Sequence, residues 1–242
     1  MDELVLLHGF AGTGRSWDAV REQLDPARYR SLAPDLRGHG RSARLRPVSF
    51  AGCVRDVLAC APDARFTIAG YSMGGRVALH VALTAPERVA RLVLVATTAG
   101  IEHPGERAER GRADAALARR AESMGTEEFA QLWQAQPIFA GTPEAAAVAW
   151  SEDLRRTAPR ELADALRGIG TGAMAPLWSR LEELTMPCDV VVGERDTKFT
   201  ALGERLVAEL PDARLHVLPG VGHGVPREAP AQLAAILASD DR

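Results

Sequence analysis

Short apolar runs alternate with amphipathic stretches along most of the chain. The predicted buried strands, each bounded by glycine, proline or polar residues, are 4–7, 29–33, 66–70, 91–95, 188–192 and 214–217. The predicted helices lie at about 16–24, 49–60, 73–83, 200–210 and 230–238, with Ser16 as the N-cap of the first. Alternation of this kind is typical of βα units. It predicts an α/β fold with a mostly parallel sheet and helices on both faces.

The pattern changes between the fourth and fifth predicted strands. From about Gly100 to Trp178 the chain is rich in Ala, Arg and Glu and contains no convincing strand. We therefore expect a single domain in which residues 1–99 and 179–242 form the α/β core and residues 100–178 an inserted helical cap. Open α/β sheets bind ligands outside the carboxyl ends of their strands, so the cap is expected to cover that edge.

Composition narrows the class of partner. The chain has 242 residues, 46% of them hydrophobic and 25% charged, with a formal net charge of -3. This balance favours a small-molecule ligand and gives no reason to expect nucleic acid or a membrane as partner. The three cysteines show neither a CxxC pair nor a zinc-like spacing, and the N-terminus carries no secretory signal pattern. We expect a cytoplasmic monomer or small homo-oligomer without a metal.

A glycine-flanked serine carries the first sign of chemistry. Residues 70–74 read Gly-Tyr-Ser-Met-Gly and fit G-x-S-x-G, with a predicted strand before them and a predicted helix after them. A sharp strand-to-helix turn needs small residues on both sides of the serine, and Gly70 and Gly74 supply them. A glycine-rich turn with an incidental serine is the alternative, but the strand and helix favour Ser72 as the reactive group.

A serine needs an imidazole, oriented by a carboxylate, before it can act as a nucleophile or a base. The fold that carries G-x-S-x-G places these groups in the chain order serine, acid, histidine. Asp196 follows the fifth predicted strand and His223 follows the sixth, so both should lie at the same edge of the sheet as Ser72. Glu194 is a competing acid, although it lies nearer the strand end and is expected to point elsewhere.

The other histidines weighed for this role are placed less well. His80 lies within a predicted helix, His103 in the insertion and His216 inside a strand. His223 is therefore the predicted base.

Two backbone N–H groups are expected to form an oxyanion hole beside the serine. One belongs to Met73, directly after the serine, and the other to Phe10, in the glycine-rich loop after the first strand. The same loop could instead bind a nucleotide. However, its glycines match neither G-x-G-x-x-G nor a phosphate-binding G-x-x-x-x-G-K-[ST].

Together these segments resemble the α/β-hydrolase superfamily over essentially the whole chain. Finer motifs are similar to the MenH family, the menaquinone-pathway synthases of 2-succinyl-6-hydroxy-2,4-cyclohexadiene-1-carboxylate. They are an arginine four residues after the serine, Lys-Phe shortly after the acid, and Trp-Gln-Ala-Gln-Pro-Ile-Phe at 133–139. The resemblance implies a lyase that eliminates pyruvate from 2-succinyl-5-enolpyruvyl-6-hydroxy-3-cyclohexene-1-carboxylate. It also implies that neither a metal nor an organic cofactor takes part.

A tricarboxylate substrate requires several cations in the pocket. By the resemblance these are Arg76, Arg110 and Arg167, since arginine binds carboxylates bidentately. Arg112 is an alternative to Arg110, because the cap aligns loosely, and any cap arginine could simply be solvated.

Two aromatic residues, Tyr71 and Trp133, are expected to pack on the substrate ring, although either could instead belong to the core. Lys198 and Phe199 are expected to fix the loop of the acid rather than to contact substrate.

Two further functions stay open. A serine esterase or carbon–carbon-bond hydrolase would use the same three residues through an acyl-enzyme and would favour a neutral or apolar pocket. A member of the fold that only binds a ligand is disfavoured, because it would not need Ser72, Asp196 and His223 together.

Overall fold

The strands form one sheet that is parallel throughout. A computed structural model describes residues 1–239; the last three residues of the predicted core, 240–242, lie outside the described part. The six-stranded sheet has the order β2-β1-β3-β4-β5-β6. Its strands are β1 (Asp2–Leu7), β2 (Tyr29–Leu32), β3 (Phe66–Tyr71), β4 (Val89–Val95), β5 (Cys188–Gly193) and β6 (Ala213–Leu218).

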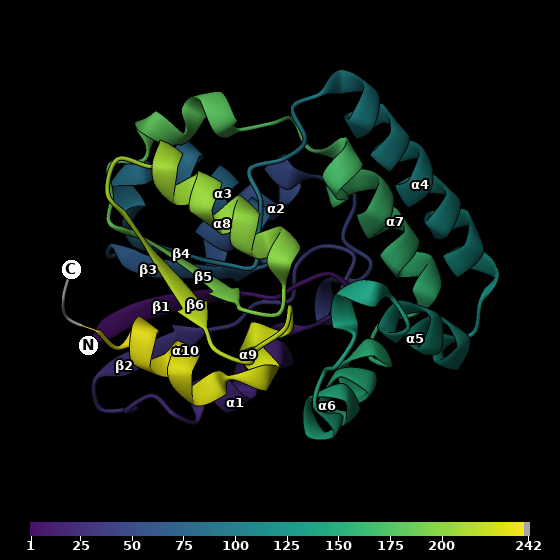
Figure 1. Cartoon of the computed structure of the whole chain (residues 1–242), viewed down its shortest axis with the longest axis horizontal. Helices are drawn as coiled ribbons and strands as arrows, with labels where there is room; N and C mark the ends of the chain where they lie inside the picture. Colours follow the sequence, from purple (N-terminus) through teal and green to yellow (C-terminus); the bar gives the residue numbers. More distant parts are fainter. Residues whose placement is uncertain (240–242) are drawn as a thin grey trace.

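Helices cover both faces of this sheet, as predicted (Figure 1). One face carries α2 (Phe50–Cys60), α3 (Met73–Thr84) and α8 (Thr197–Glu209), and the other carries α1 (Asp18–Arg21), α9 (Val225–Glu228) and α10 (Pro230–Leu237). Short 3-10 turns occupy Gly14–Trp17, Gly40–Ser42, Pro86–Arg88, Pro137–Phe139, Thr171–Ala173 and Trp178–Glu183. The α/β architecture predicted from the apolar pattern is therefore confirmed.

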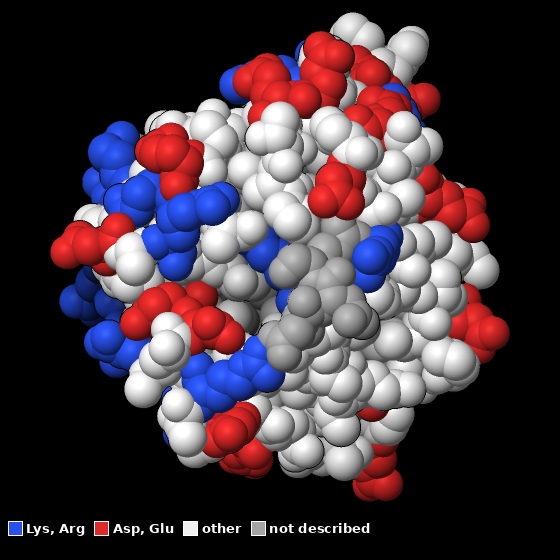
Figure 2. Space-filling view, turned by 90° about the vertical axis from the view of Figure 1, so that its left-hand side faces the viewer, with Lys and Arg blue, Asp and Glu red and all other residues white. Residues whose placement is uncertain are grey.

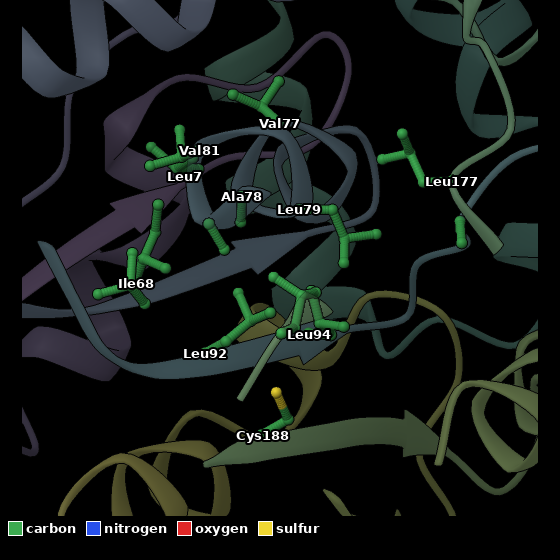
Figure 3. Close-up of a cluster of buried hydrophobic side chains, with 14 of the residues drawn as sticks. Leu7, Ile68, Val77, Ala78, Leu79, Val81, Leu92, Leu94, Leu177 and Cys188 are labelled. Carbon is green, nitrogen blue, oxygen red and sulfur yellow. The ribbon is translucent and has the colours of Figure 1, made fainter. Parts of the chain in front are cut away.

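Side chains that alternate along the strands build two separate hydrophobic cores. Ile68, Leu92 and Leu94 pack with α3 on one face, in the cluster of Figure 3, and each is fully buried. The intervening residues Ala69 and Val93 join the cluster on the other face. Period-two alternation thus gives both faces an apolar surface, and the helices bury each of them.

The register of the sheet brings the strand ends to one edge. Each of the six strands pairs with its neighbour in the order given above; Leu7, for example, pairs with Gly70, and Gly70 with Leu94. Because all the strands are parallel, the loops that follow β1, β3, β5 and β6 leave from this same edge. The candidate catalytic residues Ser72, Asp196 and His223 all lie in or directly after these loops.

The predicted helical insertion is present between β4 and β5. It contains α4 (Pro104–Ser123), α5 (Thr126–Gln134), α6 (Glu144–Leu154) and α7 (Pro159–Ile169), which lie to one side of the sheet in Figure 1. These helices enclose a third hydrophobic cluster, which includes Phe129, Trp150 and Leu162. Leu177 and Trp178, however, pack in the main core. Ala165 and Ile169 of α7 also join this core, so the cap and the sheet side share a hydrophobic cluster and the boundary at residue 178 stays a prediction.

The start of the first helix differs from the prediction. The chain forms a 3-10 turn and then the short helix α1, and Thr13 is the N-cap because its side chain accepts the N–H of Arg15. Ser16 instead donates its hydroxyl to Asp153 in α6, at 3.0 Å. The sequence pattern predicts Ser16 as a helix N-cap, but its hydroxyl binds the distant carboxylate of Asp153 instead.

The described surface has two general features. On the face of Figure 2, basic and acidic side chains are interspersed rather than gathered into a patch of one sign. Among residues 1–239, none of the helices is long and apolar enough to cross a membrane.

Candidate active site

The backbone at Ser72 has the strained geometry of a sharp elbow. Ser72 has φ +52° and ψ −108°, a backbone conformation that residues other than glycine rarely adopt. A Cβ on Gly74 would lie 2.2 Å from the carbonyl oxygen of Leu7, and one on Gly70 would lie 2.4 Å from that of Gly74. The glycines therefore allow helix α3 to start directly against the sheet, and the serine lies on the turn between them.

The three predicted polar residues meet at this elbow. His223 Nε2 lies 3.2 Å from Ser72 Oγ, and His223 Nδ1 lies 2.5 Å from Asp196 Oδ2. The histidine and aspartate side chains are almost completely buried, whereas Ser72 is only half-buried. The carboxylate fixes the Nδ1–H tautomer, which leaves Nε2 free to accept the serine proton.

Asp196, and not Glu194, is the acid that reaches the histidine. Asp196 caps helix α8, and its Oδ1 accepts the N–H of Phe199 at 3.3 Å while Oδ2 faces the ring. Glu194 Oε2 instead accepts the N–H of Gly220 at 2.8 Å. Glu194 thus points away from the histidine, as its position near the strand end suggested.

The loop after β1 passes beside the serine. A Cβ on Gly9 would lie 3.6 Å from Ser72 Cβ and 2.7 Å from the ring of Tyr71. Phe10, the next residue, lines the cavity, and Met73 is the first residue of α3. The two backbone N–H groups predicted for an oxyanion hole therefore belong to segments that flank Ser72.

A cavity of about 540 Å³ opens above these residues, between the sheet edge and the cap. Its cationic lining residues are Arg76, Arg110, Arg195 and Lys198. Its aromatic lining residues are Phe10, Tyr71, Trp133, Phe139, Trp150 and Phe199. Asp196 is the one acidic residue of the lining, and its carboxylate is occupied by His223. Such a cavity suits a small anionic molecule with a hydrophobic ring.

Arg76 is the most deeply buried of the four cations. Its guanidinium donates to the carbonyl of Ile169 at 2.7 Å, and among the described residues no carboxylate forms an ion pair with it. Burial and, to a lesser extent, the neighbouring Arg110 lower the pKa of Arg76 to about 10, although Asp114 acts in the opposite direction. A buried guanidinium that keeps free donors beside a cavity is costly unless an anion binds there.

The structure brings one of the predicted cap arginines to the cavity and not the other. Arg110 lines the cavity, and its Nε donates to Asp114 Oδ1 at 2.7 Å. Arg167 is exposed, pairs with Glu122 at 2.6 Å and does not line the cavity. Arg112, the alternative to Arg110, is also exposed and outside the lining. In this structure Arg167 therefore lies away from the cavity, directed toward Glu122 of α4, and its contact with substrate stays a prediction.

Both predicted aromatic residues lie in the cavity wall. The Trp133 ring lies 4.6 Å from that of Phe10, and its Nε1 donor has no partner among residues 1–239. Tyr71 is buried with its ring 5.4 Å from that of His223. Trp133 therefore offers the cavity a flat apolar surface, whereas its Nε1 atom is buried in the wall.

Several residues of the site were missed or placed differently by sequence reasoning. Lys198 lines the cavity, with its ammonium 5.8 Å from the Phe199 ring and without an ion pair in the described part of the chain. The Phe199 ring lies 4.6 Å from that of His223. Both residues of this Lys-Phe pair thus line the cavity, and their assignment to the loop of the acid rather than to substrate stays a prediction.

A buried carboxylate on the cap was also missed. Asp153, at the end of α6, accepts hydrogen bonds from the hydroxyl and N–H of Thr13, from Ser16, and from Arg227 at 2.5 Å. Burial raises the pKa of Asp153, but Arg227 and the Thr13 donors outweigh it, so that its pKa is lowered. This ionised carboxylate fastens α6 to the core beside the cavity, and no local sequence signal could have revealed it.

Residues 1–239 hold no group of three or more His, Cys, Asp or Glu side chains that could bind a metal ion.

The chain matches known proteins over nearly its whole length. Residues 4–236 match the family described as "Alpha/beta hydrolase family". One relative is a Bacillus subtilis (strain 168) protein provisionally named 2-succinyl-6-hydroxy-2,4-cyclohexadiene-1-carboxylate synthase. The two sequences are 36% identical, and the match covers 98% of this chain and 89% of that protein. A second relative, from Enterobacter sp. (strain 638), has the same name without the word that marks it as provisional. The two sequences are 32% identical, and the match covers 97% of this chain and 90% of that protein.

Solved structures show the same likeness. The structure of MenH from S. aureus superimposes with a TM-score of 0.91 at 29% identity, covering 98% of this chain and 91% of that one. A thermophilic esterase from Thermogutta terrifontis, described as malate bound, superimposes with a TM-score of 0.81 at 26% identity, covering 98% and 88%.

Proposed function

This chain belongs to the α/β-hydrolase family, and we propose that it is a lyase that eliminates pyruvate from 2-succinyl-5-enolpyruvyl-6-hydroxy-3-cyclohexene-1-carboxylate in menaquinone biosynthesis. The resemblance to MenH stated from the motifs is confirmed by relatives of that name and by the MenH fold. The observation that carries the proposal is the cationic cavity around Ser72. Arg76, Arg110 and Lys198 lie in its wall, where a substrate with three carboxylates needs them.

The reaction balances without an oxidant, a reductant or a metal. Ser72, after its proton passes to His223 Nε2, removes the proton from ring carbon 2, which lies next to the succinyl carbonyl. The electrons form the C2–C3 double bond, the existing double bond moves to C4–C5, and the C5–O bond breaks. The released enolpyruvate takes up a proton and becomes pyruvate.

Each part of the site has a role in this sequence. Asp196 holds the histidine tautomer and stabilises the imidazolium that forms. Negative charge develops on the succinyl oxygen when carbon 2 loses its proton. The N–H groups of Phe10 and Met73 and the amino end of α3 would stabilise that charge. Trp133 and Tyr71, which both line the cavity, would pack on the ring.

The alternative is a serine esterase or carbon–carbon-bond hydrolase, which the esterase likeness keeps in view. A hydrolase of this kind would use Ser72 as a nucleophile on a carbonyl carbon. The cavity argues against it: Arg76, Arg110 and Lys198 have no function toward a neutral ester, whereas they match a polyanion. A small anionic ligand and a cytoplasmic location both remain predictions under this proposal.

The proposal is tested by two assays run in parallel on the purified protein. Pyruvate release from the freshly prepared cyclohexene substrate is followed with lactate dehydrogenase, and ester cleavage is followed with p-nitrophenyl acetate. We expect fast pyruvate release and slow ester cleavage. In Ser72→Ala, we expect pyruvate release to fall by at least about 1,000-fold with an unchanged Tm. Fast ester cleavage with pyruvate release no faster than in enzyme-free buffer would show that the protein is a hydrolase.

A further inference from the structure

Arg195 joins three loops that are far apart in the sequence. Its backbone lies next to the acid Asp196, and its N–H donates to the carbonyl of Val221, two residues before the base, at 2.9 Å. Its guanidinium donates through Nη1 to the carbonyl of Gly141 in the cap, at 2.8 Å, and through Nη2 to Glu228 Oε2, at 2.9 Å. One residue of the acid loop therefore contacts the base loop through its backbone, and Gly141 and Glu228 through its side chain.

Glu228 holds the two peptide groups on either side of the base. Its Oε2 accepts the N–H of Gly222 at 2.8 Å, and its Oε1 accepts the N–H of Gly224 at 3.0 Å. The carboxylate is 2% exposed, so solvent competes little for these bonds. His223 stands between the two clamped residues, and its loop is therefore fixed by Glu228 and, through Glu228, by Arg195.

Gly141 is shaped for this contact on the cap side. It has φ +75°, and a Cβ at this position would lie 2.5 Å from Arg195 Nη1. A side chain here would both strain the backbone and displace the guanidinium. Ala140, its neighbour, lines the cavity, so the loop that meets Arg195 is also a wall of the substrate site.

We propose that Arg195 and Glu228 are positioning residues that couple the seating of the cap loop at Gly141 to the placement of His223 against Ser72 and Asp196. With the cap loop seated, Gly141 and Glu228 share the guanidinium and the base loop is held. With the loop displaced, Arg195 loses one anchor and Glu228 loses the partner that orients it. The inference deepens the proposed function but rests only on its serine–histidine–aspartate part.

The expected effect on catalysis is large because the serine–histidine contact is sensitive to small displacements. His223 Nε2 and Ser72 Oγ are already 3.2 Å apart, at the outer end of hydrogen-bond distance. A shift of about 1 Å in a reacting group can cost about 100-fold in rate. Loosening the base loop should therefore slow the activation of Ser72 even though neither Arg195 nor Glu228 touches the serine.

The test measures Ser72 activation without the cyclohexene substrate. A small alkyl fluorophosphonate phosphonylates an activated serine: the Oγ–P bond forms, the P–F bond breaks, and the serine proton passes to His223. We expect Arg195→Met and Glu228→Gln to slow labelling by at least about ten-fold. We expect Gly141→Ala, a change confined to the cap, to slow it by about three-fold or more.

A double mutant separates coupling from independent damage. If the cap loop acts on the base through Arg195, Gly141→Ala should have no further effect once Arg195 is methionine. The downfield Nδ1 proton signal of His223, which reports its 2.5 Å bond to Asp196, should broaden or disappear in Arg195→Met and in Gly141→Ala. A role in stability alone would leave this signal unchanged.

Matched controls use the same substitutions where the structure assigns no such contact. Arg180→Met removes an arginine that also pairs twice with a glutamate, at 2.8 Å in both cases, away from the cavity. Gly125→Ala changes a cap glycine with nothing near its Cβ position. Both should label at the wild-type rate.

Wild-type labelling of Gly141→Ala, or additive effects in the double mutant, would overturn the coupling. If Arg195→Met did not fold, Gly141→Ala and Glu228→Gln would still decide the question. A protein that labels normally but releases no pyruvate would remove the lyase proposal and leave this inference standing.

Discussion

The sheet edge and the cap contribute to one cavity, but they position their side chains in different ways. Ser72, Asp196 and His223 each follow a parallel strand, and the strand ends fix them within hydrogen-bond distance of one another. Arg110 and Arg167 stand on cap helices, and only Arg110 reaches the cavity. A residue at a strand end is placed by topology. A residue on a helix turns by about 100° with each step along the chain, so its direction depends on how that helix packs.

The two regions also differ in how they carry positive charge. On the sheet side, Arg76 is buried and donates to a single carbonyl, without a carboxylate partner among the described residues. On the cap side, Arg110 is partly exposed and is already neutralised by Asp114. We therefore expect the sheet side to provide most of the binding energy for an anion, and the cap to adjust it.

The largest effect that tests this comparison is expected at Arg76. Arg76→Met should lower kcat/KM for pyruvate release by about 100-fold, because a desolvated guanidinium–carboxylate contact is lost. The Tm should stay equal or rise, since a buried charge without a carboxylate partner is removed. Steady-state kinetics and a thermal melt measure the two quantities on the same sample.

Arg76→Lys serves as the matched control, because it keeps the charge and removes the bidentate geometry, and it should recover part of the activity. Unchanged kcat/KM together with a lower Tm in Arg76→Met would assign Arg76 to the core instead of the substrate.

A second effect concerns pH, and it is expected in the sheet half of the molecule. His8 and His39 are fully buried under the site; His8 Nε2 accepts the N–H of Leu36, so His8 is neutral with its proton on Nδ1. Burial lowers the pKa of His8, and burial together with His8 lowers that of His39 to about 3. The unfolded chain binds these protons below its ordinary pKa of about 6.5.

The contribution of these two neutral histidines to the free energy of unfolding is therefore fully present above pH 6.5, and it is lost as the pH falls from there toward 3. Between pH 7 and pH 5, His39 alone should lower the free energy of unfolding by about 2 kcal/mol. His39→Asn keeps a donor for the carbonyl of Arg37 and should flatten this dependence in thermal melts. His103, an exposed residue of the helical insertion, provides the control: the dependence of Tm on pH should be the same in His103→Asn as in the wild type. An equally steep slope in His39→Asn would refute the assignment.

The smallest effect separates the two cap arginines. Arg110→Ala should lower kcat/KM for pyruvate release by about ten-fold, since it removes one cation from the cavity wall. Arg167→Ala should change it by less than about two-fold, because its partner is Glu122 on the surface. An equal loss in both variants would mean that α4 and α7 rearrange around the substrate.

Sequence reasoning reached the parts of the site that local patterns encode. Ser72 was marked by its flanking glycines, and Asp196 and His223 by their positions after apolar runs. Asp153 carries no such mark, because the Thr13 groups that it binds lie 140 residues away in the sequence. The ion pair of Glu228 with Arg195 likewise joins residues that are 33 positions apart. Ser16 shows the same limit, since its local capping pattern gave way to a bond with Asp153. Contacts between distant segments follow from packing, and one sequence does not show them.

The central claim is that Ser72 removes the proton on ring carbon 2 instead of attacking a carbonyl carbon. It is tested most directly by single-turnover pyruvate release from substrate carrying deuterium at carbon 2, with intact-protein mass spectrometry on the same quenched samples. The account predicts slower release from the deuterated substrate and no mass added to the protein at any time. Equal rates for the two substrates, with an acyl mass appearing on wild-type protein and absent from Ser72→Ala, would contradict it.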